Sequence, residues 1–145
     1  MNFLGALHIS SSGLSAQRVR MNVISSNLAN VSTTRTPQGG PYRRKDVVFA
    51  THQGSEPFQN VLNSHLDSQL SEVRVIGIIT DPRPAQIKYD PQHPDANDQG
   101  YVELPNVNVM EEMVNMISAT RSYEASVAAI NATKSMAIKA LEIGR

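Results

Sequence analysis

The chain contains no cysteine among its 145 residues, which excludes disulfide bonds and metal sites built from thiolates. It also carries no net charge, because 13 basic residues balance 13 acidic ones. A general nucleic-acid binder normally shows a basic excess, so this balance argues against nucleic acid as a partner. Long apolar runs are missing too: the most apolar stretch, around residues 75–79, is far shorter than the ~20 residues that cross a membrane.

The first residues lack the pattern of a cleavable secretion signal. Ser10, Ser11 and Ser12 interrupt any hydrophobic core, and the basic residues Arg18 and Arg20 follow that segment instead of preceding it. We therefore expect a protein that either stays in the cytoplasm or leaves it by a route that cleaves no signal.

The polar residues form no recognisable catalytic or metal-binding motif. The four histidines are scattered, and no cysteine joins them in a zinc site. Residues 95–100 resemble a calcium loop only faintly, because Gln99 and Asn106 stand where that loop needs ligands of another type. Residues 64–67 include a serine, a histidine and an aspartate, but no nucleophile motif accompanies them. We expect no enzyme activity, no cofactor, no metal and no small-molecule substrate.

The last third of the chain, residues 108–143, is free of proline and glycine and predicts one long helix. Asn108 followed by Glu111 predicts a capped start, and Gly144 suits the position after the last turn. At ~1.5 Å per residue this helix would be roughly 54 Å long, more than the ~38 Å expected across a compact globule of this size. We therefore predict an elongated molecule.

Two heptad seams run along this predicted helix, and they require partners from this chain or from others. The first seam comprises Val109, Met116, Tyr123, Ile130 and Ala137. The second seam comprises Met113, Thr120, Val127, Lys134 and Leu141.

Residues 3–30 show a second helical pattern with a seven-residue apolar repeat. Gly5 and Gly13 weaken this helix, which is either a marginal first helix of a bundle or a segment that becomes ordered on assembly. The side chains that come next compete with the helix for backbone hydrogen bonds, so the helix should end near Asn30. The repeat comprises Leu7, Leu14, Met21 and Leu28.

The middle of the chain predicts a small β-rich module with irregular connections. The short basic cluster at residues 43–45 is interpreted as a solvated strand face. The predicted strands are residues 42–49, 73–80, 86–89 and 101–104, with loops at 53–70 and 90–100. The fold class is therefore mainly α with a small β-rich insert, its N- and C-terminal helices paired as an elongated coiled coil. The expected division is an N-terminal helix (1–31), a β-rich module (32–107) and a C-terminal helix (108–145).

Both ends of the chain resemble signatures of the flagellar rod, hook and hook-associated proteins. Residues 26–30 (SNLAN), with Thr36 and the YRR of residues 42–44, are similar to the N-terminal signature of that family. The C-terminal signature is matched by residues 112–117 (EMVNMI) and 121–125 (RSYEA). Three further stretches, at residues 34–49, 89–101 and 104–109, resemble a proximal-rod member of the family.

The resemblance implies a structural subunit of the flagellar basal-body proximal rod. Such a subunit would be exported by the flagellar type III apparatus without signal cleavage. It would then assemble with other rod proteins and copies of itself into a helical drive shaft that crosses the periplasm and transmits torque. The terminal helices would form the inner layer of that shaft.

Within this hypothesis we assign an assembly interface to both terminal helices. Its apolar part places Leu7, Leu14, Met21, Ile24 and Leu28 opposite Met113, Met116, Tyr123, Val127, Ile130 and Leu141. Polar contacts that fix the register are assigned to Asn27, Asn30, Arg121 and Glu124.

Two other classes of protein remain open from the sequence. One is a soluble helical adaptor or export chaperone that binds a partner helix. It would be well ordered in isolation, and the low helix propensity of residues 10–13 argues against it. The other is an enzyme whose site is assembled from scattered polar residues. Its only support in the sequence is the loop at residues 90–100, which has no other explanation.

Overall fold

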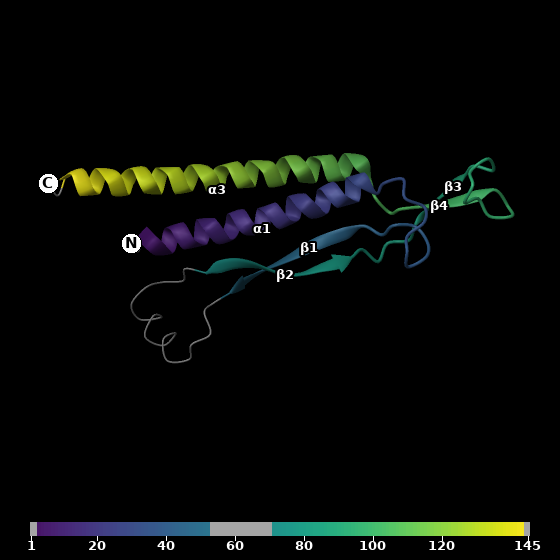
Figure 1. Ribbon diagram of the computed structural model, residues 1–145, viewed down its shortest axis with the longest axis horizontal. Coiled ribbons are helices and arrows are strands. Elements are labelled where there is room, and N and C mark those ends of the chain that lie inside the picture. The colour runs from purple at the N-terminus through teal and green to yellow at the C-terminus, as the bar shows by residue number, and fades with distance from the viewer. Residues whose placement is uncertain (1–2, 53–70, 144–145) are drawn as a thin grey trace. The chain divides into compact units, whose positions relative to one another are not determined.

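The computed structural model describes residues 3–52 and 71–143. In chain order one long helix precedes a small β region and another follows it, as the sequence predicts (Figure 1). The elements in chain order are α1 (Phe3–Ala29), β1 (Lys45–His52), β2 (Glu72–Thr80), β3 (Gln86–Tyr89), β4 (Tyr101–Leu104) and α3 (Val109–Ile143). No helix in these described ranges is both long enough and apolar enough to cross a membrane.

The chain divides into two compact units, and each is considered by itself. The first unit contains residues 1–19, 49–76 and 120–145, and the second contains residues 20–48 and 77–119. Both helices contribute one part of their length to each unit.

Helix α1 runs without interruption through its serine-rich segment. The hydroxyls of Ser10 and Ser12 donate hydrogen bonds to carbonyls one turn earlier, 2.9 and 2.8 Å away. These bonds satisfy both hydroxyl groups inside the helix. The helix ends where the sequence predicts, because the Asn30 side chain donates to the Ser26 carbonyl (2.8 Å) and closes the last turn.

Helix α3 begins at a side-chain cap. The Oδ1 atom of Asn108 accepts hydrogen bonds from the backbone N–H groups of Met110 (3.0 Å) and Glu111 (3.4 Å). These two donors have no partner inside the helix, so the cap stabilises its start. The predicted start at Asn108 is confirmed.

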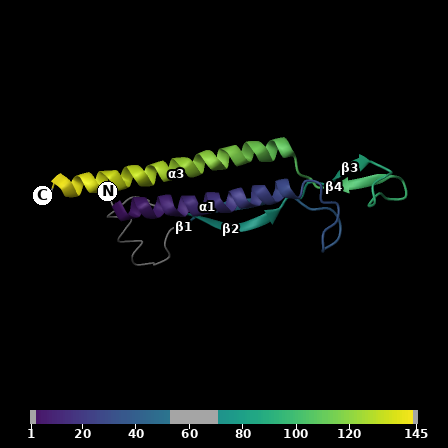
Figure 2. The same cartoon turned by 45° about the horizontal axis from the view of Figure 1, so that its top comes forward.

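The four strands form two separate two-stranded sheets, β1 with β2 and β3 with β4 (Figures 1 and 2). In the second sheet the strands are antiparallel, and Gln86 lies opposite Leu104 while Tyr89 lies opposite Tyr101. Strands β3 and β4 have the predicted bounds, and β2 begins one residue early. The predicted loop at 53–70 lies outside the described residues.

Strand β1 begins three residues later than predicted and continues to residue 52. The backbone N–H of Tyr42 donates to the Thr33 carbonyl (3.0 Å), and that of Arg44 donates to Oδ1 of Asn106 (2.8 Å). Because these amides are used by a loop and a side chain, the strand ladder starts only after them.

The β3–β4 connection is a compact loop held by its own hydrogen bonds. Oδ1 of Asn97 accepts from the backbone N–H groups of Gln99 (3.0 Å) and Tyr101 (2.8 Å). Gly100 has a φ of 80°, and a Cβ at this position would lie 2.9 Å from Cε2 of Tyr89. The glycine is therefore required both by backbone conformation and by space.

Candidate functional site

A carboxylate lies at the centre of the second unit. The side chain of Glu112, in the first turns of α3, is fully buried. Its Oε1 accepts a hydrogen bond from Nε of Arg44 (2.8 Å), and its Oε2 accepts one from Nδ2 of Asn27 (3.0 Å). Both carboxylate oxygens are thus bonded to groups from other elements of this unit, which compensates the cost of burying the charge.

Asn27, near the end of α1, uses its entire hydrogen-bonding capacity inside the chain. Its Nδ2 donates to Glu112 and to the Lys45 carbonyl (2.8 Å). Its Oδ1 accepts from the Lys45 N–H (3.0 Å) and from the Tyr42 hydroxyl (3.0 Å). An amide offers two donors and two main acceptor positions, so this buried side chain is saturated. It joins α1, β1 and α3.

Arg44 connects the same carboxylate to two aspartates. Its side chain is only 9% exposed, and Nη1 lies 3.2 Å from Asp46 and 3.5 Å from Asp81. Burial by itself lowers the pKa of Arg44, but the hydrogen bonds and charges of Glu112 and Asp46 outweigh this effect and raise the pKa. The prediction that residues 43–45 form a solvated face is wrong for Arg44, because three carboxylates draw it inward.

A second arginine completes the network. The carboxylate of Asp81 accepts hydrogen bonds from the Arg83 side chain (2.8 Å to Nε) and backbone N–H (2.9 Å). These bonds lower the pKa of Asp81 to about 2. Nδ2 of Asn106 donates to the Arg83 carbonyl (3.0 Å), so the segment after β2 is fixed to the segment before α3. The residues Asn27, Arg44, Asp81, Asn106 and Glu112, together with Asp46 and Arg83, are called the polar network below.

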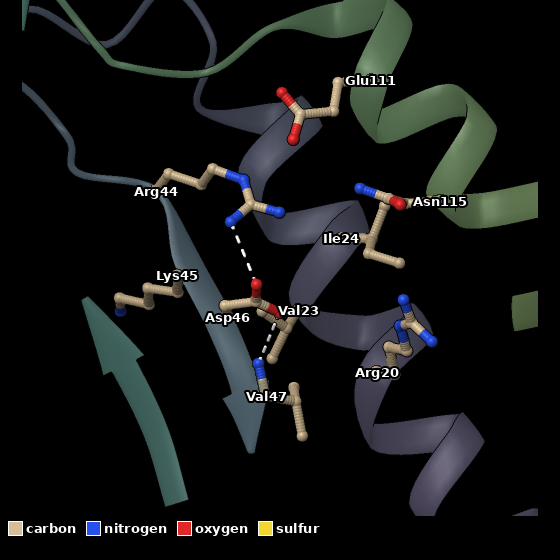
Figure 3. Close-up of a pocket in the computed structure, with 9 residues that line it drawn as sticks. All are labelled: Arg20, Val23, Ile24, Arg44, Lys45, Asp46, Val47, Glu111 and Asn115. Atoms are coloured by element: carbon tan, nitrogen blue, oxygen red, sulfur yellow. Dashed lines mark hydrogen bonds and ion pairs between the residues drawn. The ribbon is translucent and has the colours of Figure 1, made fainter. Parts of the chain in front are cut away.

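A cleft of about 200 Å³ opens beside the polar network (Figure 3). Arg20, Val23 and Ile24 of α1 form one wall, and Glu111 and Asn115 of α3 form another. Residues 44–47 supply the third wall. The cleft is lined mainly by polar groups and carries charges of both signs.

Helix α3 exposes apolar side chains close to the buried carboxylate. Met110, Met113, Val114 and Ile117 are 70, 49, 64 and 54% exposed. Their spacing places them on one side of the helix. We call these four residues the outer apolar face. Contiguous exposed apolar surface on a soluble chain usually marks an interaction site.

The predicted interface residues of α1 are all at least partly covered within the chain. Ile24 and Asn27 are buried. The half-buried residues are Leu7, Leu14, Met21, Leu28 and Asn30.

On α3 the predicted interface residues divide into two groups. The half-buried group comprises Met116, Tyr123, Val127 and Ile130, and the exposed group comprises Met113, Arg121, Glu124 and Leu141. The first seam is therefore more covered than the second. The role of these predicted interface residues in contacts between subunits stays a prediction.

Sequence reasoning missed Arg44 and Glu112 as site residues. The fully covered positions of α3 are Glu112 and Ala119, seven residues apart. Neither is a large apolar residue, so a count of apolar side chains passes over them. The available signal was that Glu112 lies seven residues before Ala119, on the same side of the predicted helix. No group of acidic or histidine residues suited to a metal ion occurs within the described ranges.

The comparisons with known proteins agree with the resemblance at both ends of the chain. Residues 7–35 match the family model described as flagella basal body rod protein. Residues 98–143 match the model described as flagellar basal body rod FlgEFG protein C-terminal.

Similar proteins extend over the whole chain. The flagellar basal-body rod protein FlgC of Borreliella burgdorferi is 48% identical over 99% of this chain and 98% of its own length. The FlgC proteins of Bacillus subtilis and Yersinia enterocolitica are 48% and 43% identical, each over 100% of both chains. The prediction of a rod subunit is confirmed, and the chain belongs to the FlgC family of flagellar basal-body rod proteins.

Proposed function

We propose that this chain is built into the proximal rod through its two terminal helices. The helices of residues 1–31 and 108–145 pair as a coiled coil and form the inner layer of a helical shaft. The β-rich module of residues 32–107 makes the lateral contacts. Torque is carried by many packed interfaces between other rod proteins and copies of this chain, without a catalytic step, a cofactor or bound nucleic acid.

The outer apolar face is the observation that carries this proposal. Its four side chains are between 49 and 70% exposed, yet they are neighbours on one side of α3. Water contact with this much apolar surface is unfavourable, and each large side chain that becomes buried contributes about 1.5–3 kcal/mol. A neighbouring rod subunit that covers the face would supply that stabilisation only on assembly.

The exposed apolar residues of α3 in the first unit support the same interpretation. Met136, Ile138 and Leu141 are 62, 48 and 76% exposed. Leu141 belongs to the predicted second seam. Exposure in both units favours a helix that finds its partners in other subunits.

The route to the rod follows from the same proposal. The rod lies in the periplasm, and the flagellar type III export apparatus carries the subunit there without cleaving a signal.

Substitution of one residue in the outer apolar face tests the proposal. We expect Ile117→Asp to be folded and exported, because the side chain is already 54% exposed. It should not form rods, because assembly would then bury an unpaired charge. Export is measured as secreted subunit, rod formation by electron microscopy of basal bodies, and function by swimming.

The matched control is Ile117→Leu, which keeps an apolar side chain of the same size. It should assemble and support swimming. Normal rods and normal swimming in the Ile117→Asp strain would contradict the proposal.

A further inference from the structure

The cleft beside the polar network presents hydrogen-bond donors that have no partner in the described part of the chain. Arg20 lines it and has no hydrogen-bond or ion-pair partner in the described part of the chain. Nη1 and Nε of Arg44 are engaged by carboxylates, whereas its other terminal nitrogen points into the cleft toward Asn115 (Figure 3). Two guanidinium groups and an amide therefore surround one space.

The chemistry of the cleft suits a single carboxylate. Arginine forks bind carboxylates with paired hydrogen bonds, and Asn115 can donate one more. The volume of about 200 Å³ equals about seven waters at ~30 Å³ each, which accommodates one short acidic side chain. Asp46 and Glu111 also line the cleft and would repel a doubly charged anion such as phosphate.

The same unit carries an unused carboxylate on a rigid support. Asp98 is exposed at the tip of the β3–β4 loop and has no partner among the described side chains. It sits in a turn closed by a hydrogen bond from the Gly100 N–H to the Asn97 carbonyl (2.8 Å). A short side chain on a pre-organised turn loses little entropy on binding. No residue of the β3–β4 hairpin lines the cleft, so the two surfaces are separate.

We propose that Asp98 of one copy inserts into the Arg20–Arg44 cleft of a second copy. The inference rests on the proposed function, because it describes a lateral contact between rod subunits. Each copy offers both a cleft and a carboxylate on different surfaces, so the contact is heterologous and can be repeated from copy to copy. The Arg20 guanidinium and the Asp98 carboxylate, which have no partner in the described part of the chain, are thereby paired between chains.

Cross-linking of two tagged copies in assembled rods tests the contact directly. One copy carries Glu111→Cys at the cleft and the other carries Gln99→Cys beside Asp98, so Arg20 and Asp98 stay in place, and the chain has no native cysteine to interfere. A short bismaleimide cross-linker should join the two cysteines into a dimer that contains both tags. The control pair replaces Glu111→Cys with Arg18→Cys, which does not line the cleft and should give little cross-linked dimer.

A charge exchange supplies a second, independent measurement. Arg20→Asp and Asp98→Arg should each lower the recovery of rods about tenfold, as the loss of a close interfacial charge pair does. The double variant restores opposite charges and should recover to within about twofold of the parent chain. Arg18→Asp makes the same change in net charge and should leave rod recovery unchanged.

The outcomes separate this contact from the proposed function. If the Arg18 variants form rods but no dimer with both tags appears and the charge exchange restores nothing, the contact is overturned and the rod assembly stands. Cross-linking of Glu111→Cys to another rod protein instead of a second copy would also overturn it. Failure of the unaltered chain to enter rods would overturn the proposed function and this contact together.

Discussion

Neighbouring positions at the start of α3 reverse the usual distribution of polar and apolar residues. Glu112 is fully buried, and its carboxylate accepts hydrogen bonds from Arg44 and Asn27. Met113 is 49% exposed, although it is apolar. The polar network is satisfied inside the chain, while the outer apolar face lacks a cover there. The difference indicates that the polar groups hold the single subunit in shape and the apolar groups serve contacts with other subunits.

Removal of the buried carboxylate from the polar network should lower the stability of the subunit more than any other change considered below. Glu112→Ala leaves the Arg44 guanidinium and the Asn27 amide buried without their shared partner. We expect a loss of about 3–5 kcal/mol in the free energy of unfolding, measured by urea denaturation of the purified subunit.

Glu111→Ala is the matched control for that substitution. The Glu111 carboxylate is 44% exposed and lies 3.7 Å from Arg83. Its removal should cost less than about 1 kcal/mol. Equal losses for the two glutamates would show that the polar network does not hold the second unit together.

The next largest effect is expected at the β3–β4 loop that presents Asp98. Gly100→Ala places a Cβ 2.9 Å from Tyr89 at a φ of 80°. We expect a loss of about 2 kcal/mol in stability, measured by thermal or urea unfolding. Gly40→Ala has a similar φ of 74° but open space around its Cβ, so it isolates the cost of the backbone conformation at about 1 kcal/mol. If Gly100→Ala lowers stability no more than Gly40→Ala does, the close contact with Tyr89 does not contribute to the loss.

Acid should weaken the polar network without touching the outer apolar face. The pKa of Asp81 is lowered from 3.8 to about 2 by its hydrogen bonds to Arg83. Because the pKa is lower in the folded chain than in the unfolded one, the stabilisation is fully present above about pH 4 and is lost as the pH falls toward 2. Urea midpoints measured across this range should fall less steeply for Asp81→Asn than for the parent chain. Identical slopes for both chains would contradict the assignment.

The smallest effect on the single subunit is expected at the outer apolar face. Val114→Gln changes a side chain that is 64% exposed. The free energy of unfolding should shift by no more than about 0.5 kcal/mol. A loss as large as that of Glu112→Ala would mean that the face already packs within the subunit, and the contrast between the two regions would disappear.

Local chemistry made much of the fold predictable. The Asn108 cap, the end of α1 near Asn30 and the bounds of β3 and β4 depend on residues close in sequence. Turn and capping preferences therefore suffice for them.

The polar network could not be obtained in the same way. The hydrogen bond between Asn27 and Glu112 joins residues 85 positions apart, and the one between Arg44 and Glu112 joins residues 68 apart. A buried charge gives no apolar periodicity, so the heptad analysis assigned interior positions only to apolar side chains. The same analysis included Met113 in a seam but did not single out Met110, Val114 and Ile117, whose spacing places them on the same side of the helix.

Methionine oxidation, compared between the purified subunit and intact rods, tests the central claim most directly. Met110 and Met113 are 70 and 49% exposed in the single chain, and exposed thioethers are oxidised to sulfoxides. We predict rapid oxidation of both residues in the purified subunit and strong protection in the rod, because a neighbouring subunit covers the outer apolar face. Equally rapid oxidation of both residues in intact rods would show that this face stays in water after assembly and would contradict the account.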